Sequence, residues 1–181
     1  MNIQSYHYRY KMVVSQFSIM RMTVDTIRAF IAIELPVEIQ LGIEEVVKRL
    51  SSKGGTVRWV QPRNIHLTLK FLGEITPAEL SRLKSALKAE VGQCNSFAFQ
   101  VEGIGVFPNA YRPRVVWVGV KAPVELSALY QRVEEGCQRV GFGSEERGFT
   151  PHLTMGRVNQ SAKPEDALKL GELVKSTVVG R

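Results

Sequence analysis

Two tetrapeptides of one pattern are the part of this chain best suited to chemistry: His-Leu-Thr-Leu at 66–69 and His-Leu-Thr-Met at 152–155. They contain two of the three histidines in 181 residues. Both alternate polar and apolar residues, which is the period of a half-buried β-strand. On each strand the histidine and the threonine therefore share one face. We expect the two strands to face each other across a cleft and to present both imidazoles to one substrate.

A pair of imidazoles suits the cleavage of a phosphodiester. Histidine titrates near neutrality, so a neutral imidazole can take a proton from an attacking water while a protonated one gives a proton to the leaving oxygen. Thr68 and Thr154 share the faces of His66 and His152, and their hydroxyls can donate to non-bridging phosphate oxygens. Chemistry of this kind requires neither a metal ion nor another cofactor.

The negative charge on the phosphate still needs a cation, and Arg157 is the nearest candidate. Strict alternation along the strand would place Arg157 on the face of Leu153. Gly156 would permit a β-bulge that turns the arginine toward the histidine face. The sequence by itself leaves both placements open.

Other site chemistries fit the sequence poorly. A single His-x-Thr on a strand is more often structural, but two copies 86 residues apart favour catalysis. Two histidines without clustered Asp, Glu or Cys partners do not resemble a metal site. The chain has no G-x-S-x-G, P-loop or dinucleotide-binding motif. Cys94 and Cys137 are isolated, which argues against a disulfide scaffold and favours a reducing cytoplasm.

Composition indicates a folded protein that does not span a membrane. The chain is 44% hydrophobic and 23% charged, which argues against wholesale disorder. No apolar run approaches the roughly 20 residues that a membrane span needs. The net charge of +7 fits a polyanionic ligand such as RNA, although many proteins without nucleic acid ligands are equally basic.

Hydrophobic periodicity and breaker residues predict the order β-α-β-β-α-β-β-α-β-α. A capping box at Thr76 and Glu79 marks the start of the second helix. The expected strands are 27–35, 57–60, 65–72, 97–107, 113–120 and 149–158, and the expected helices are 36–50, 77–91, 123–140 and 164–176. We expect Gly73 to end the strand that carries the first tetrapeptide.

This order predicts an α+β fold with two antiparallel sheets, each backed by helices. The spacing of the tetrapeptides is close to half the chain, which suggests a duplication and a two-lobed body with pseudo-twofold symmetry. We expect residues 25–181 to form this single domain. Residues 1–24 contain no acidic residue and no cleavage site of the signal-peptide type. They are predicted to be a disordered extension or the product of an upstream start codon.

Taken together, the motifs and their surroundings resemble the 2H phosphoesterase superfamily, and within it the bacterial and archaeal RNA 2′,3′-cyclic phosphodiesterases, also called 2′-5′ RNA ligases. The resemblance covers about 27–158. It rests on segments 28–33, 57–60, 66–74, 103–108, 113–117 and 150–158.

The resemblance implies a bilobal 2H phosphoesterase fold with both motifs lining a central groove. It implies hydrolysis of RNA 2′,3′-cyclic phosphate ends to 2′-phosphomonoesters, with the joining of tRNA halves as the reverse reaction. His66 would be the proton donor to the 3′ oxygen and His152 the base. Thr68 and Thr154 would hold phosphate oxygens, and Arg157 falls where the family has a phosphate-binding arginine. The implied partner is RNA with a cyclic phosphate end, in the cytoplasm, and we expect a monomer.

Two alternatives stay open. Another 2H activity, on cyclic nucleotides or on 2′-5′ oligonucleotides, would keep both histidines and change the groove. A non-catalytic RNA-binding module would keep only the fold. Phe30 or Phe107 could stack on a terminal base, although a place in the core is the more ordinary role for either ring.

The chain also departs from the family pattern at its C-terminus. Only 24 residues follow Arg157, fewer than in most family members. We expect this shortening to leave an exposed sheet edge, which would affect stability.

Overall fold

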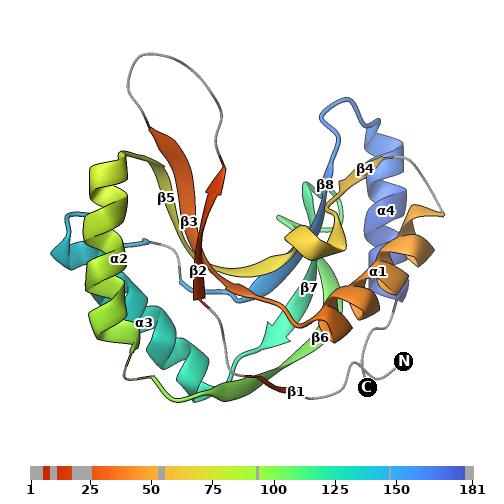
Figure 1. Ribbon diagram of the computed structural model, residues 1–181. Helices are drawn as coiled ribbons and strands as arrows, with labels where there is room; N and C mark the ends of the chain where they lie inside the picture. Colours follow the sequence, from red (N-terminus) through yellow and green to blue (C-terminus); the bar gives the residue numbers. More distant parts are fainter. Residues whose placement is uncertain are drawn as a thin grey trace.

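The strands of this protein form two arms that rise from a shared base, with helices on their outer sides (Figure 1). The computed structural model describes residues 6–8, 12–17, 26–52, 56–92, 94–146 and 148–177. In this part of the chain, no helix is both long enough and apolar enough to cross a membrane.

The predicted order of elements is confirmed from residue 27 to residue 176. The elements are β3 (Ile27–Glu34), α1 (Val37–Ser51), β4 (Val57–Trp59), the 3-10 turn η1 (Pro62–Asn64), β5 (His66–Ile75), α2 (Pro77–Val91), β6 (Phe97–Phe107), β7 (Val115–Lys121), α3 (Val124–Arg139), β8 (His152–Val158) and α4 (Pro164–Ser176).

The region before residue 25 differs in part from its prediction as a disordered extension. It contains two strands, β1 (Tyr6–Tyr8) and β2 (Met12–Phe17). β1 pairs with β6, and β2 pairs with β3. Each added strand satisfies backbone groups that an edge strand would otherwise leave unpaired. The rest of residues 1–24 lies outside the described residues, and the domain boundary stays a prediction.

All strand pairs are antiparallel, and their order is β1-β6-β7-β8-β5-β3-β2, with β4 pairing β8. One arm contains β2, β3 and β5, and the other contains β4, β6, β7 and β8. The two arms meet where β5 pairs β8, through Leu67 and Leu153. The two predicted sheets are therefore one continuous sheet, joined where the arms meet.

The helices cover the outer faces of the arms and close the core. α2 and α3 lie together on the β3–β5 arm, and α1 and α4 lie on the other arm (Figure 1). The apolar stripes of α1 and α2 are buried, and their buried residues are Ile39, Ile43, Val46, Leu50, Leu80, Leu83, Leu87 and Val91. Burial of these faces against the sheet is the main force that holds each helix in place.

Two local features show how sequence signals act in this fold. The predicted capping box is present, because the Glu79 N–H donates to Thr76 Oγ1 over 3.2 Å and the Thr76 N–H donates to Glu79 Oε2 over 2.7 Å. The prediction that Gly73 ends its strand is wrong, since β5 continues to Ile75. Gly73 has a φ of 74°, which glycine adopts without a steric cost, so the strand bends there and remains paired with β3.

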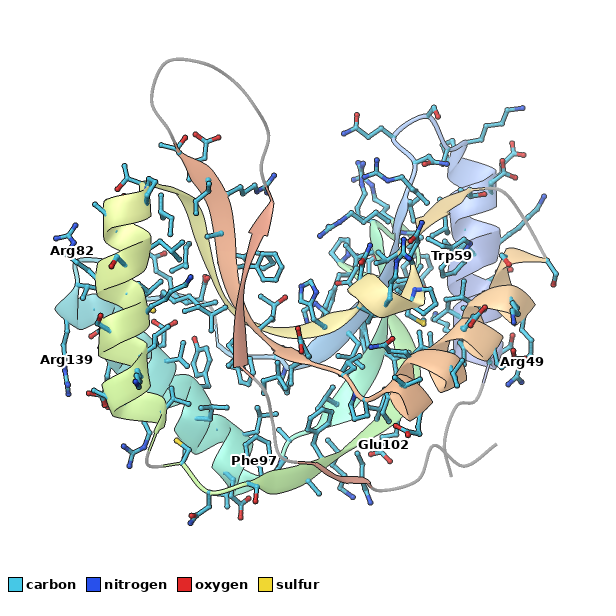
Figure 2. All side chains as sticks on the ribbon, viewed as in Figure 1. Arg49, Trp59, Arg82, Phe97, Glu102 and Arg139 are labelled. Carbon is cyan, nitrogen blue, oxygen red and sulfur yellow. The ribbon has the colours of Figure 1, made fainter. Side chains whose placement is uncertain are left out.

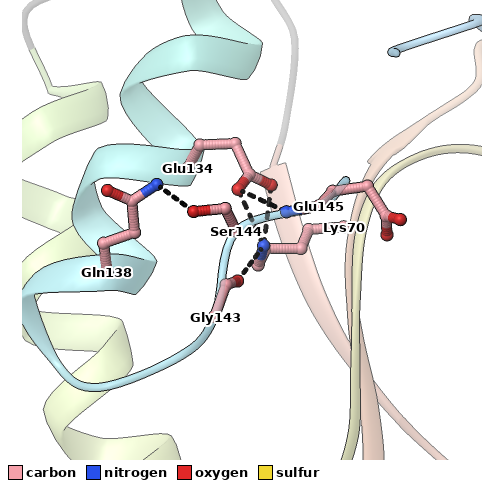
Figure 3. A network of polar contacts seen from close by, with 6 residues as sticks. All are labelled: Lys70, Glu134, Gln138, Gly143, Ser144 and Glu145. Carbon is pink, nitrogen blue, oxygen red and sulfur yellow. Dashed lines mark hydrogen bonds and ion pairs between the residues drawn. The ribbon is translucent and has the colours of Figure 1, made fainter. Parts of the chain in front are cut away.

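A buried ion pair joins β5 to α3 behind the first motif (Figure 3). Lys70 Nζ lies 2.8 Å from both carboxylate oxygens of Glu134 and donates to the Gly143 carbonyl over 2.8 Å. The same carboxylate accepts the Glu145 N–H over 3.3 Å. The segment around 143–145 leads to the second motif, so this network connects the first motif strand to the chain that enters the second.

We predict that Lys70→Met destabilises the protein by about 3–5 kcal/mol, because it leaves the Glu134 carboxylate buried without its cation. The double variant Lys70→Met/Glu134→Leu should recover most of this loss, since it removes both charges. Urea unfolding of the three proteins measures the effect.

Lys48→Met is the matched control. It removes a lysine whose ion pairs with Glu44 and Glu45 are exposed, and such pairs contribute little to stability. Equal losses of stability in Lys70→Met and Lys48→Met would contradict the importance of burial for the Lys70–Glu134 pair. A double variant no more stable than Lys70→Met would contradict it as well.

Candidate active site

The two motifs meet at the junction of the arms. Leu67 on β5 lies opposite Leu153 on β8, and both side chains are fully buried. Extending this antiparallel register by one residue in each direction places His66 opposite Thr154 and Thr68 opposite His152. Because successive residues point to opposite faces, all four polar side chains share the face away from the leucines. A local pseudo-twofold axis passes between the leucines and relates the motifs.

A β-bulge follows the motif in β5. Ala32 of β3 lies opposite Thr68, and Ile31, the residue before it, lies opposite Lys70, so Leu69 is skipped. Leu69 and Lys70 are consequently both buried, and alternation resumes with the next residue turned to the groove. That residue is Phe71, whose side chain is 63% exposed.

β8 carries the same irregularity at the corresponding place. Trp117 of β7 lies opposite Thr154 and Val116 lies opposite Gly156, so Met155 is skipped. The bulge turns Arg157 to the motif face, as the presence of glycine before it allowed. A side chain at Gly156 would have its Cβ 2.5 Å from Val57 and 2.9 Å from Trp59, so β4 packs closely at this point.

A groove of about 670 Å³ opens at the motif face, on the β3–β5 side of the junction. It is lined by Arg28, Ala29, Phe30, Val60, Asn64, Ile65, His66, Thr68, Phe71, Gly73, Thr154 and Arg157. Four of the five predicted site residues therefore lie in one lining. The fifth, His152, is outside that lining. It lies two residues before Thr154 on β8, on the same face of the strand.

Both imidazoles are held in the same tautomer. Nδ1 of His66 lies 2.9 Å from the Asn64 carbonyl oxygen, and Nδ1 of His152 lies 2.8 Å from the Thr150 carbonyl oxygen. A carbonyl oxygen only accepts, so each Nδ1 must carry the hydrogen. In the neutral rings this leaves each Nε2 with a lone pair for a proton. The site thus offers two Nε2 atoms that can each act as base or, once protonated, as acid.

The surroundings of the two rings differ. His66 stacks on Phe30, with ring centroids 4.5 Å apart and an interplanar angle of 18°. Burial lowers the pKa of His66 below its ordinary value, and the hydrogen bond to Asn64 opposes this only in part. Phe30, at 7% exposed, belongs mainly to the core, as its ordinary role predicts.

His152 contacts aromatic rings of its own arm, on β6 and β7. Phe107 lies edge-on to it, with centroids 5.0 Å apart, and Trp117 lies at 6.5 Å. Phe107 also contacts Trp117, with ring centroids 5.1 Å apart, and is less exposed than Phe71. The Trp117 ring fills the space beside Gly105, where a Cβ would overlap it, which explains the glycine there.

The groove is positively charged where it meets the motifs. Its lining contains Arg28 and Arg157 and no acidic residue. The hydroxyls of Thr68 and Thr154 form no hydrogen bond within the described part of the chain, so both can donate to a ligand. Two hydroxyl donors, guanidinium groups and two imidazoles make up an anion site with acid–base groups at its edge.

Among the lining residues that sequence reasoning missed, Phe71 and Arg28 have the side chains best suited to contact a nucleotide. Strict alternation from Leu67 would have turned Phe71 into the core, and only the bulge at Leu69 brings it to the groove. The sequence of β5 alternates without interruption from His66 to Phe71, so nothing in it signals the bulge.

Two further features concern sites other than the motif face. A cavity of about 370 Å³ lies between α3 and a segment that contributes Ser144, Glu145, Glu146, Gly148 and Phe149, and no residue of either motif lines it. Within the residues that the structure describes, no group of three or more His, Cys, Asp or Glu side chains is arranged to hold a metal ion. Metal independence stays a prediction.

Comparisons with known proteins point to one family. The family model described as LigT like Phosphoesterase matches residues 33–117. A Thermotoga maritima protein named RNA 2′,3′-cyclic phosphodiesterase is 38% identical over 131 residues, which cover 72% of this chain and 70% of the relative. A protein of the same name from Archaeoglobus fulgidus is 39% identical over 140 residues, 77% of each chain.

Solved structures agree with the sequence relatives. A crystal structure of a Thermus thermophilus protein superposes with a TM-score of 0.66 at 28% identity, covering 75% of this chain and 76% of its own. Apo E. coli LigT superposes with a TM-score of 0.61 at 30% identity, covering 76% and 75%. The paired motifs, the two-armed sheet and these relatives together show that the chain belongs to the LigT-like family of 2H phosphoesterases, which is a family of phosphodiesterases.

Proposed function

We propose that this protein hydrolyses RNA 2′,3′-cyclic phosphate ends to 2′-phosphomonoesters, with His66 and His152 as its acid and base. The arrangement of the two motifs carries this proposal, because one strand register puts both histidines and both threonines on one face. The names of the relatives support an RNA 2′,3′-cyclic phosphate as substrate. Structures of E. coli LigT with 3′-AMP and with phosphate support a nucleotide phosphate in this groove.

In the proposed reaction, His152 Nε2 takes a proton from water as the water oxygen attacks phosphorus. The bond between phosphorus and the 3′ oxygen breaks, and His66 Nε2–H gives its proton to that oxygen. The products are a 2′-phosphomonoester and a free 3′-hydroxyl, and the two histidines have exchanged protonation states. Solvent restores the starting states before the next turnover.

The other side chains of the groove stabilise the charge on the phosphate and position the substrate. Thr68 and Thr154 donate hydroxyl hydrogens to the non-bridging oxygens, and Arg157 stabilises the charge that grows on them. Phe71 provides an exposed ring at the wall of the groove, on which a terminal base can stack. Run in reverse, the same groups would join a 2′,3′-cyclic phosphate to an RNA end through a 2′-5′ linkage. A cytoplasmic monomer acting on tRNA halves stays a prediction.

We predict that His66→Ala and His152→Ala each lower turnover of a short RNA with a 2′,3′-cyclic phosphate end by about 10²–10⁴-fold, the usual contribution of an acid or a base. His7→Ala is the matched control, since it removes the third histidine and should retain activity. The assay contains EDTA and identifies the product by its 2′-phosphate.

The same assay separates the alternatives. A wild type that loses its activity in EDTA would contradict the metal-independent mechanism. Faster turnover of a cyclic mononucleotide or a 2′-5′ oligonucleotide in direct competition would favour another 2H activity. A folded wild type that binds RNA with equal affinity before and after His66→Ala, and turns over none of these substrates, would identify a binding module.

The lowered pKa of His66 predicts a pH dependence. As the acid, His66 must be protonated, so kcat/KM should fall as pH rises through a pKa below 6.5, the ordinary value for histidine. A bound phosphate anion raises the pKa of His66, so the alkaline limb of kcat should lie at higher pH. Phe30→Leu removes part of the burial and should move the alkaline limb of kcat/KM upward.

The limb that moves identifies the role of His66. If Phe30→Leu moves the acidic limb instead, His66 is the base and the proposed roles are exchanged. Phe97→Leu is the control, because it removes a ring from the core away from both motifs (Figure 2) and should move neither limb.

A further inference from the structure

The arm that carries the second motif ends in a pair of arginines. Arg58 on β4 lies directly opposite Arg157 on β8. Directly opposed residues of an antiparallel pair point to the same face, with Cβ atoms about 5 Å apart. The neighbours of Arg58 in β4, Val57 and Trp59, pack against Gly156 on the core side. Arg58 therefore lies on the groove side, next to the phosphate-binding arginine and farther from the junction.

This pairing is unfavourable for the fold taken alone. Like charges directly opposite each other on neighbouring strands destabilise a sheet. Among the residues that the structure describes, neither Arg58 nor Arg157 forms an ion pair or a side-chain hydrogen bond. β7 lies on the other side of β8 and places Val115 opposite Arg157, so it supplies no counter-charge in this row. Two exposed guanidinium groups side by side fit an extended anionic ligand.

The opposite arm has no equivalent of this pair. The pseudo-twofold counterpart of Arg157 is Phe71, since each is the residue turned to the groove just after the bulge. The aromatic wall of the groove thus contains Phe71, with Arg28 on the same arm, and the opposite wall contains Arg157. A single nucleotide would occupy the anion site and the aromatic wall and leave Arg58 beyond them, because Arg58 does not line the groove.

Resting on the function proposed above, we propose that Arg58 binds the phosphodiester that precedes the terminal nucleotide of an RNA strand. Arg157 holds the reacting cyclic phosphate, the terminal base lies toward Phe71, and the strand leaves the groove over β4. The substrate selected by this geometry is an RNA strand rather than a cyclic mononucleotide. Arg58 is a binding residue and takes no part in proton transfer.

The test compares two substrates: a short RNA with a 2′,3′-cyclic phosphate end, and 2′,3′-cyclic AMP, which lacks the preceding phosphodiester. Arg58→Gln should raise KM for the RNA about tenfold, as expected for one lost charge-assisted contact, with kcat little changed. The rise in KM for cyclic AMP should be several times smaller. For the RNA, the slope of log affinity against log salt should fall by about 0.7, the value for one phosphate contact on a single strand.

Three further measurements sharpen the result. Arg58→Lys keeps the charge and should keep most of the salt slope. Arg49→Gln removes the same charge from the outer side of α1, where Figure 2 shows this side chain directed away from the groove, and should change neither substrate. The melting temperature of Arg58→Gln should equal or exceed that of the wild type, because one of two repelling charges is gone.

Each contrary result has a distinct meaning. Equal rises in KM for both substrates, or a salt slope unchanged in Arg58→Gln, would overturn the role of Arg58 and leave the proposed function standing. An equal effect of Arg49→Gln would also overturn it, because net charge would then explain the loss. A wild type that turns over neither substrate would count against the proposed function itself.

Discussion

The pairing of β5 with β8 is the constraint on which the rest of the structure depends. Through Leu67 and Leu153 it joins the two arms, and the same register sets which side chains face the groove. A slip of one residue would turn the leucines outward and both histidines into the core. Full burial of the two leucines opposes such a slip, since exposing each would cost about 1.5–3 kcal/mol. Packing behind the sheet therefore determines the chemistry in front of it.

The two halves keep one backbone geometry and use it for different purposes. Each motif is followed by a bulge that buries two successive residues and turns the third to the groove. In β5 the second of these buried residues is Lys70, which donates hydrogen bonds to the Glu134 carboxylate and the Gly143 carbonyl (Figure 3). In β8 its counterpart is Gly156, whose missing side chain lets β4 pack closely. The symmetric sheet thus places Phe71 on one wall of the groove and Arg157 at the equivalent position on the other.

Sequence reasoning reached the elements and the motif face because both depend on local patterns. Alternation around His66 and His152 predicted their strands, and the Thr76 capping box predicted the start of α2. Gly156 showed that Arg157 could lie on either face of its strand, but the sequence did not determine which face it takes. The exposure of Phe71 and the stacking of Phe30 on His66 were out of reach, since both follow from register shifts between strands distant in sequence. Local patterns specify a strand, whereas its bulges are defined by its pairing with other strands.

The proposed function depends on both imidazoles carrying Nδ1–H and directing Nε2 toward one phosphate. Nitrogen NMR of the histidine side chains tests this directly, with His66→Ala and His152→Ala used to assign the signals and inorganic phosphate as the titrant. We expect the Nδ1–H tautomer for both rings when neutral, and phosphate-dependent shifts at the Nε2 of both. An Nε2–H tautomer at either ring, or a response confined to one histidine, would contradict it.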